Sequence, residues 1–383
     1  MVQEPEIRWG LDGVYIKESG ICLIDLDNAK IYYRGYELSE LALKSTFEET
    51  AYLVLRGKLP SKAELSEFSN ELAMNRELPK ELLTFLKGLP SGLRPIDVLR
   101  LSIDYLGTLD RDAVAKGPNE EGKAIRLIAM SPTIVATYRR LTTDGSVPRP
   151  RHDLSHVANY FYMFFGREPS DEELRALETM FITYMEHGMN NSSFTAVTVA
   201  STLTDIYSVI VAALSSLKGP LHGGANFEAL RTILEVGDPS RAEEYVIDKV
   251  RRGEKIIGFG HRVYKRFTDP RVSYLRELAY RLAVSKGGKY LRLYETARAL
   301  EDAVEKHLGH KGVHANTDLY ASLIYYTLGF PMEYNPANFA LARIVGWVAH
   351  VLEYWVMGGK LIRPMERYVG PRDLKYVPIN ERE

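Results

Sequence analysis

The chain has 383 residues, of which 45% are hydrophobic and 26% are charged, and its formal net charge is −1. This length allows two domains, or one large domain with a substantial core. A net charge so small gives no overall field that would attract nucleic acid or an anionic membrane, so anionic ligands would need local arginine clusters. The single cysteine, Cys22, excludes an intrachain disulfide and a multi-cysteine metal site.

The first ten residues include Glu4 and Glu6 and lack the apolar stretch of a signal peptide. The uncharged run over residues 206–217 is too short to span a bilayer. We therefore expect a cytoplasmic protein that binds neither membrane nor nucleic acid. Glutamine occurs once, at Gln3, in a chain with many charged residues, and this bias suggests a thermophilic source.

The predicted secondary structure changes once along the chain. Residues 21–24 and 31–33 are short apolar runs on either side of a polar turn, which predicts a β-hairpin or three short strands. After Gly35 the apolar residues follow helical spacing. Helix starts are indicated at Ser61, Pro79, Pro95 and Ser170.

The sequence predicts three further segments, one loop and two helices. We expect a charged loop over residues 117–121, an amphipathic helix over 124–141, and a long buried helix over 194–217. Because almost nothing after the hairpin has the pattern of a strand, the sequence predicts a large, mostly α protein with short connections.

The stretch from Lys218 to Asn226 ends the predicted buried helix. Gly219 and Pro220 cannot readily continue a helix, and His222 follows them beside two glycines that allow backbone or ligand to come close. Taken alone, this pattern fits either a helix–helix turn with an incidental histidine or a histidine placed for chemistry.

A second stretch combines a Gly-x-Gly loop with cations. His261, Arg262 and Lys265 follow the loop over residues 258–260, and several cations around one loop could hold a polyphosphate; the alternative is a solvated basic surface. Shortly after it, Pro270 fixes a turn that presents Arg271, whose planar guanidinium suits a carboxylate.

Three further charged residues lie next to apolar segments. Asp318 opens an apolar helix, where it is either a first-turn charge stabilised by the helix dipole or a general base with a raised pKa. Arg343 and Arg363 have apolar neighbours, and each alone fits a structural ion pair. The histidine groups at 152/156 and 307/310/314 have helical spacing, but no cysteine or carboxylate completes a convincing metal site.

Together these stretches resemble the citrate synthase family over nearly the whole chain. The motifs that carry the resemblance, in the family's order, are Tyr33-Arg34-Gly35-Tyr36, Gly57-Lys58-Leu59-Pro60, Lys218-Gly219-Pro220-Leu221-His222-Gly223-Gly224-Ala225-Asn226, the stretch 258–265, Asp269-Pro270-Arg271, Asn316-Thr317-Asp318-Leu319-Tyr320 and Gly346-Trp347-Val348-Ala349-His350.

The resemblance implies an almost all-α homodimer whose subunits each have two helical domains. Residues 1–221 and 327–383 would form the large domain, with the dimer interface and the oxaloacetate site. Residues 222–326 would form a smaller, mobile domain that binds CoA, hinged near Gly219 and Gly329. The implied reaction condenses acetyl-CoA with oxaloacetate and water to citrate and CoA, without a metal or another cofactor.

The resemblance also implies roles for particular residues. Asp318 would remove a methyl proton from the thioester, neutral His222 would donate a hydrogen bond to the thioester oxygen, and His261 would donate to the oxaloacetate carbonyl. The residues expected to bind oxaloacetate are His187, His222, His261, Arg271, Arg343 and Arg363, the last from the partner subunit.

The same resemblance implies two further sets of residues, one that binds CoA and one that positions His222. The residues expected to bind CoA are Lys255, Ile256, Ile257, Gly258, Phe259, Arg262 and Lys265. Asn190 and Ser192 are expected to hold the His222 ring in place without contacting the substrate themselves.

Three other functions remain open at this point. A 2-methylcitrate synthase that uses propionyl-CoA would need the same motifs, because one methylene in an apolar pocket gives only about 10–200-fold discrimination. A non-catalytic relative that binds an acyl-CoA is a second alternative, although the presence of all three catalytic groups argues against it. A metal-dependent hydrolase built on the histidine groups is a third.

Overall fold

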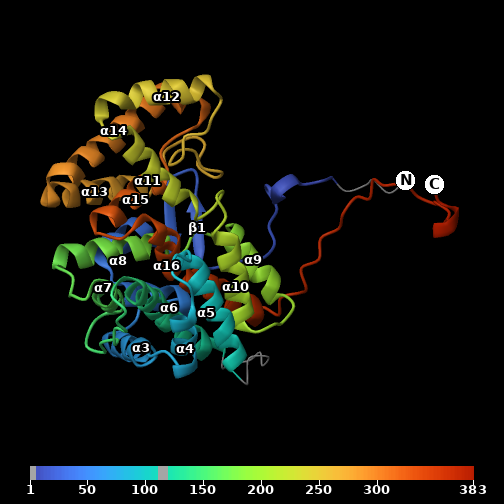
Figure 1. Cartoon of the computed structure of the whole chain (residues 1–383), viewed down its shortest axis with the longest axis horizontal. Helices are drawn as coiled ribbons and strands as arrows, with labels where there is room; N and C mark the ends of the chain where they lie inside the picture. Colours follow the sequence, from blue (N-terminus) through green and yellow to red (C-terminus); the bar gives the residue numbers. More distant parts are fainter. Residues whose placement is uncertain (1–5, 111–119) are drawn as a thin grey trace.

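The computed structural model describes residues 6–110 and 120–383. The described part contains sixteen α-helices and one small sheet near the N-terminus (Figure 1). The mostly α fold with a short N-terminal sheet confirms the prediction from the sequence.

The sheet has three antiparallel strands in the order β1-β2-β3: β1 (Cys22–Asp25), β2 (Lys30–Tyr33) and β3 (Tyr36–Glu37). In the β1–β2 turn, the Asp25 carboxylate accepts hydrogen bonds from the backbone N–H groups of Asp27 and Asn28. This Asx turn sets the register that pairs Cys22 with Tyr33.

The first ten helices follow the sheet: α1 (Leu38–Lys44), α2 (Phe47–Arg56), α3 (Lys62–Met74), α4 (Lys80–Gly88), α5 (Pro95–Leu109), α6 (Glu120–Thr143), α7 (His156–Phe165), α8 (Asp171–Met185), α9 (Asn191–Ala200) and α10 (Ile206–Leu217). The predicted starts of α3 and α8 are confirmed, because Ser61 with Glu64 and Ser170 with Glu173 form complete capping boxes.

Three predicted segments differ from the structure. The expected long helix over 194–217 is two helices, because the chain turns at Leu203 (φ +65°) and Asp205 caps α10 by accepting from the Ser208 N–H. The expected loop over 117–121 lies outside the described residues up to 119, and its last two residues begin α6. The helix expected to be amphipathic, α6, is instead buried nearly all round over residues 123–138.

The later helices are α11 (Ala225–Val236), α12 (Ala242–Arg251), α13 (Val272–Lys286), α14 (Gly288–Leu308), α15 (Thr317–Thr327) and α16 (Asn335–Val356), with short 3₁₀ turns η2 (Pro239–Arg241), η3 (Gly309–Lys311) and η4 (Met332–Tyr334) between some of them. In Figure 1, α11 to α15 gather at one end of the molecule, and the labelled helices α3 to α7, α9 and α10 lie away from that end. The assignment of 222–326 as a separate mobile domain stays a prediction.

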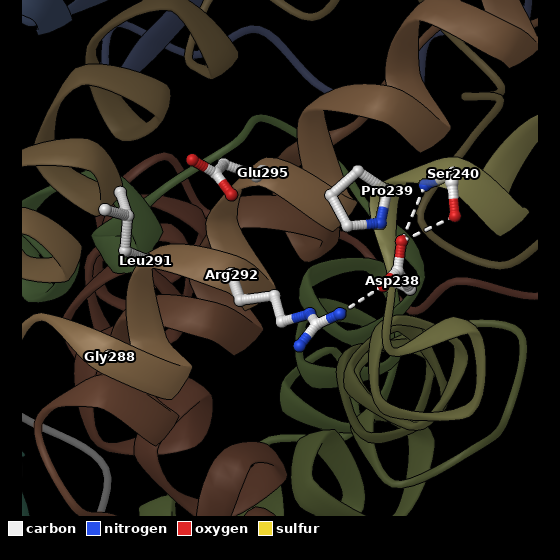
Figure 2. Close-up of a pocket in the computed structure, with 7 residues that line it drawn as sticks. All are labelled: Asp238, Pro239, Ser240, Gly288, Leu291, Arg292 and Glu295. Atoms are coloured by element: carbon white, nitrogen blue, oxygen red, sulfur yellow. Dashed lines mark hydrogen bonds and ion pairs between the residues drawn. The ribbon is translucent and has the colours of Figure 1, made fainter.

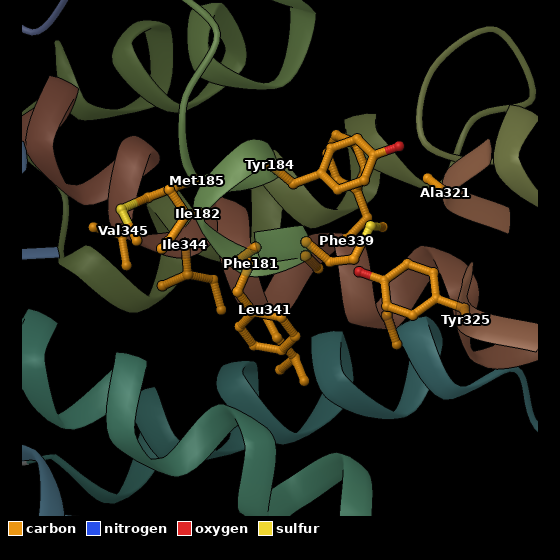
Figure 3. Close-up of a cluster of buried hydrophobic side chains, with 14 of the residues drawn as sticks. Phe181, Ile182, Tyr184, Met185, Ala321, Tyr325, Phe339, Leu341, Ile344 and Val345 are labelled. Atoms are coloured by element: carbon orange, nitrogen blue, oxygen red, sulfur yellow. The ribbon is translucent and has the colours of Figure 1, made fainter. Parts of the chain in front are cut away.

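The core is centred on α16, which packs against α8, α9 and α6. Side chains from α8, α15 and α16 meet there in one cluster that includes Phe181, Tyr325, Phe339 and Leu341 (Figure 3). The segment Met332–Val356 is long and apolar enough to cross a membrane, but 78% of its apolar window is buried inside the protein. Its apolarity is therefore that of a core helix.

Candidate active site

His222 lies in the tight turn between α10 and α11. Its N–H donates to the Gly219 carbonyl at 3.0 Å. A Cβ on Gly223 would lie 2.8 Å from the Leu217 side chain, and one on Gly224 would lie 2.9 Å from the Gly219 carbonyl oxygen. The two glycines are therefore required for this close approach, and the turn aims His222 back toward α9 and α16.

Ser192 holds the His222 ring from α9. The Ser192 hydroxyl donates to Asn190 Oδ1 at 2.8 Å, lies 2.8 Å from His222 Nε2, and accepts a hydrogen bond from Trp347 Nε1 at 3.1 Å. Asn190 also caps α9 by accepting from the Ser193 N–H. With Nε2 engaged by Ser192, the ring nitrogen left for a ligand is Nδ1. A neutral His222 ring donates from Nδ1 only when the Ser192 hydroxyl turns its proton from Asn190 Oδ1 to Nε2.

His261 follows the glycine loop, and its tautomer is set by the backbone. Its Nδ1 accepts hydrogen bonds from the N–H groups of Val263 at 3.0 Å and Tyr264 at 3.4 Å. An acceptor nitrogen carries no proton, so the neutral ring has its N–H at Nε2, where it can donate to a ligand.

His187 lies beside His261 and is buried. The two rings are 5.5 Å apart between centroids, and Tyr264 joins them, since its hydroxyl is 2.7 Å from His187 Nε2 and its ring is 4.6 Å from the His261 ring. The backbone before His187 is held from the sheet. There the Tyr33 hydroxyl donates to the Glu186 carbonyl at 2.6 Å and accepts from the Glu186 N–H at 3.1 Å.

All three histidines are neutral near pH 7. Burial, followed by the nearby Arg343, lowers the pKa of His222 to about 4. Burial also lowers the pKa of His261 to about 4; Arg271 acts in the same direction, and Asp269 opposes them. Burial holds the pKa of His187 well below its usual value, and Arg271 adds to that effect. Neutral imidazoles near a ligand donate hydrogen bonds without adding charge.

Asp318 stands in the first turn of α15. Asn316 caps this helix by accepting from the Asp318 N–H, and its amide donates to the Gly260 carbonyl at 2.9 Å, so it ties Asp318 to the loop of His261. Burial raises the pKa of Asp318 to about 6, although the hydrogen bond from Asn226 and the charge of Arg271 act in the opposite direction. A carboxylate with such a pKa suits a general base at neutral pH.

The two candidate arginines of the core are both buried, with 4% of Arg271 and 2% of Arg343 exposed. The guanidinium of Arg271 makes a bidentate pair with Asp269 through Nε and Nη2. Arg343 donates from Nε to the Tyr184 carbonyl at 2.6 Å and lies over the Phe339 ring, 4.8 Å from its centroid. It forms no ion pair with any residue of 6–110 or 120–383.

Phe339 brings these groups together. Its ring lies 4.4 Å from the Tyr184 ring, between centroids (Figure 3). The Phe339 ring also lies 6.2 Å from the His222 ring, between centroids. The structure thus gathers His187, His222, His261, Asp318, Arg271 and Arg343 from five segments of the chain around one region.

The residues expected to bind CoA are placed differently. Lys255, Arg262 and Lys265 are exposed, and Arg262 donates to the Gly10 carbonyl at 3.0 Å. Ile256 and Phe259 are buried in the core, so their side chains are not open to a ligand as they stand. Gly258 has φ +94°, and its carbonyl accepts from the Asn316 N–H. The seven residues therefore do not form one ready surface.

Arg363 also lies apart from the gathered residues. It is exposed on the segment after α16, which leaves the body of the molecule beside the N-terminal segment (Figure 1). A separate surface pocket is lined by Asp238, Pro239, Ser240, Gly288, Leu291, Arg292 and Glu295, and it includes none of the candidate residues (Figure 2).

Several residues that shape the site were not singled out from the sequence. Phe339, Tyr184 and Tyr264 are aromatic residues in apolar or basic stretches, with nothing local to mark them. The partner of Arg271, Asp269, stands two residues before it, and Asn226 closes the motif that contains His222, so both could have been found there. In the described part of the chain, no three His, Cys, Asp or Glu residues group as metal ligands.

This arrangement suits an enzyme that binds an anion with buried arginines and moves a proton beside it. A family model described as the citrate synthase C-terminal domain matches residues 10–365. The citrate synthase of Deinococcus radiodurans is 42% identical over 380 residues, covering 98% of this chain and 99% of the relative. The chain belongs to the citrate synthase family, and its enzyme class is that of the acyltransferases of citrate synthase type.

Two further comparisons bear on the substrate. The solved ternary complex of carboxymethyl coenzyme A and oxaloacetate with citrate synthase from the thermophilic archaeon Thermoplasma acidophilum has a TM-score of 0.93 and 33% identity, covering 98% of this chain and 100% of that one. A 2-methylcitrate synthase of Mycobacterium tuberculosis is 37% identical over 369 residues, covering 96% of this chain and 92% of the relative.

Proposed function

We propose that this chain condenses acetyl-CoA with oxaloacetate and water to give citrate and CoA. The observation that carries the proposal is a base of raised pKa, Asp318, gathered with three neutral histidines and two buried arginines. A thioester methyl group is a very weak acid, so its ionisation needs both a base and a donor to the developing charge.

Oxaloacetate carries two carboxylates, and they match the buried cations. Arg343 has no ion pair within the described residues, and Arg271 keeps Nη1 free of its pair with Asp269. His187 is proposed to donate a further hydrogen bond. Bidentate contacts of this kind both anchor the substrate and orient its carbonyl.

The proposed chemistry has three steps. Asp318 removes a methyl proton, and the Nδ1–H of neutral His222, whose Nε2 then accepts from the Ser192 hydroxyl, stabilises the enol oxygen that forms. The enol carbon then attacks the oxaloacetate carbonyl, whose oxygen gains negative charge and a hydrogen bond from His261 Nε2–H. Water finally cleaves the thioester of citryl-CoA, which releases CoA and citrate.

Closure of the smaller domain is part of the proposal. Residues 222–326 would turn over bound oxaloacetate about the breaks near Gly219 and Gly329 and exclude water before the enol forms. The same movement would bring Lys255, Arg262 and Lys265 to the CoA phosphates, with the backbone of 256–259 beside the adenine. Their exposure in the present arrangement is compatible with a site assembled on closure.

A homodimer is proposed to complete the site. The segment after α16 exposes apolar side chains, with 80% of Met365, 90% of Val369 and 81% of Tyr376 accessible. An extended apolar segment of this kind needs a covering surface, and a second copy of the chain supplies one by symmetry. Arg363 on this segment would then reach the partner's oxaloacetate.

We also propose a cytoplasmic enzyme of thermophilic origin that needs no metal or other cofactor. The donors of the candidate site are imidazoles, guanidinium groups and a carboxylate, which can supply the chemistry themselves. Full activity after extensive dialysis against a strong chelator would agree with this proposal, and loss of activity that zinc or magnesium restores would contradict it.

The experiment that tests the function is thiol release from acetyl-CoA with and without oxaloacetate, beside the same assay with propionyl-CoA. We expect release that depends on oxaloacetate and is faster with acetyl-CoA. Faster release with propionyl-CoA would make the enzyme a 2-methylcitrate synthase with the same mechanism. No release with either thioester from folded protein would overturn the proposal.

A further inference from the structure

Asn226 stands one residue into α11, four positions after His222, and only 1% of it is exposed. Its amide nitrogen Nδ2 donates to Asp318 Oδ1 at 3.2 Å. Its own Oδ1 is buried and has no hydrogen-bond partner. A buried amide that leaves half of its bonding unused is costly, so packing of α11 against α15 does not account for asparagine at this position.

An amide can serve both protonation states of a carboxyl group. The carboxylate accepts a hydrogen bond from the amide N–H, as observed. After Asp318 takes a proton it carries an O–H, which needs an acceptor. Rotation of the Asn226 amide about its Cβ–Cγ bond would present the unpartnered Oδ1 to that O–H without moving the backbone.

We propose that Asn226 is a positioning residue for the base: its N–H orients the Asp318 carboxylate before proton abstraction, and its Oδ1 accepts from the Asp318 O–H afterwards. The inference rests on the proposed role of Asp318. In this proposal, the side chain of Asn226 in α11 connects the turn that holds His222 to the base, Asp318.

Other charged groups near α15 act on Asp318 as well. Arg271 favours its ionised form and Asp269 opposes it, both from the residues just before α13, and Tyr184 faces it from α8. Elsewhere around the helix, Glu301 and Arg298 of α14 bind each other and Tyr320, Glu228 of α11 pairs with Arg231, and Glu333 of η4 is exposed. Asn226 is the only one of these neighbours with a hydrogen bond to the Asp318 carboxylate among the described residues.

The test is the pH dependence of turnover for Asn226→Ala and Asn226→Asp, with Thr232→Val as the control on the same helix. Loss of the N–H donor favours the protonated base, so we expect the acid limb of kcat to move to higher pH in Asn226→Ala. A second carboxylate beside Asp318 should move it further in Asn226→Asp. The KM for oxaloacetate should stay within about twofold in both, because Asn226 makes no hydrogen bond with Arg271 or Arg343, which are proposed to bind the carboxylates of oxaloacetate.

The limiting kcat at high pH, its plateau, distinguishes the two roles proposed for Asn226, which are donor to the Asp318 carboxylate and acceptor from the Asp318 O–H. With no acceptor for the Asp318 O–H, the plateau rate of Asn226→Ala should fall about tenfold or more. A shifted limb with a wild-type plateau would overturn the acceptor half. An unshifted limb in both variants, or a KM effect alone, would overturn the whole.

Circular dichroism and the melting temperature establish that each variant is folded, and Asn226→Asp, nearly isosteric with asparagine, keeps the test available if Asn226→Ala does not fold. Failure of this inference is distinct from failure of the proposed function. If the wild-type chain releases no thiol, the function fails; if it is active and the variants keep its pH profile, only the role of Asn226 fails.

Discussion

The two sides of the candidate site are prepared to different degrees. On the oxaloacetate side, Arg271 and Arg343 are buried and are held by Asp269 and by the Tyr184 carbonyl. On the side proposed to bind CoA, Lys255 and Lys265 are exposed, and within residues 6–110 and 120–383 no side-chain hydrogen bond or ion pair holds them. A buried cation must be fixed during folding because its desolvation has to be offset, whereas an exposed one stays free until a ligand arrives. One chain thus fixes two of the arginines proposed to bind the dicarboxylate, while the residues proposed to bind CoA, and Arg363, depend on the proposed closure and dimer.

The largest expected effect is on the base. Asp318→Asn should lower kcat about 10²–10⁴-fold while oxaloacetate still binds, because the buried arginines are untouched. Steady-state thiol release and oxaloacetate binding by calorimetry would measure the two effects. Asp248→Asn, on the exposed face of α12, is the control, and near-normal turnover of Asp318→Asn would refute the base assignment.

A substitution at Arg271 tests the proposed oxaloacetate side, where the cations are buried and held in place. Arg271→Leu removes a substrate contact and leaves Asp269 buried without its partner, so we expect a free energy of unfolding lower by about 3–5 kcal/mol. The KM for oxaloacetate should also rise steeply. Denaturant unfolding would be compared with Arg281→Leu, an exposed arginine of the same helix. A stability loss no larger than that of the control would contradict the buried pair.

Mixed subunits test whether Arg363 of one chain serves the oxaloacetate site of the other chain in the proposed dimer. Arg363→Leu and Asp318→Asn are each expected to be nearly inactive alone. In a hybrid dimer, one site would combine Asp318 of one chain with Arg363 of the other, so an equal, exchanged mixture should regain about a quarter of the wild-type rate. If Arg363 served its own chain, every site of the hybrid would lack one group. No recovery after demonstrated subunit exchange would then be the result.

The pH profile should reflect Asp318 and not the histidines. The base must be ionised and its pKa is about 6, so the rate should fall about tenfold per unit below that pH and level off above it. His222 and His261, with pKa values of about 4, stay neutral throughout this range. A rate that is constant from pH 5 to 8 would show that proton abstraction by Asp318 does not limit turnover.

The smallest effect is expected on the exposed side. Lys265→Ala should raise the KM for acetyl-CoA only a few-fold, and less at high salt, because an exposed charge contributes about 1 kcal/mol or less. Lys87→Ala, an exposed lysine of α4, is the matched control. A KM for acetyl-CoA raised 100-fold or more would show that Lys265 is buried against the ligand after closure. Both sides of the site would then bind their substrates through buried cations.

The sequence predicted most of what depends on local pattern. The sheet, the capped starts of α3 and α8, and the turn of His222 all have signals within a few residues, since capping boxes and Gly-Pro breaks act locally. The break between α9 and α10 was missed because it rests on a non-glycine residue, Leu203, in a left-handed conformation, which apolar periodicity does not reveal.

For the site, the resemblance supplied the residues and the structure supplied their relations. That Phe339 joins His222 to Arg343 and Tyr184, and that Asn316 ties Asp318 to the loop of His261, depends on packing between segments far apart in the chain. No pattern within a single stretch contains that information. Asn226 is intermediate, because its motif was visible while its bond to Asp318 was not.

The contact between Tyr33 and the end of α8 has a consequence for how the enzyme matures. Tyr33 and Glu186 are 153 residues apart in the chain. The hydrogen bond from the Tyr33 hydroxyl to the Glu186 carbonyl fixes the backbone just before His187. Joining segments so far apart costs more chain entropy than forming a local helix, so we expect this contact to form after the helices. During refolding, the helical signal in circular dichroism should therefore return before catalytic activity does. A newly made chain would pass through a stage that is helical and compact but not yet able to hold its substrate.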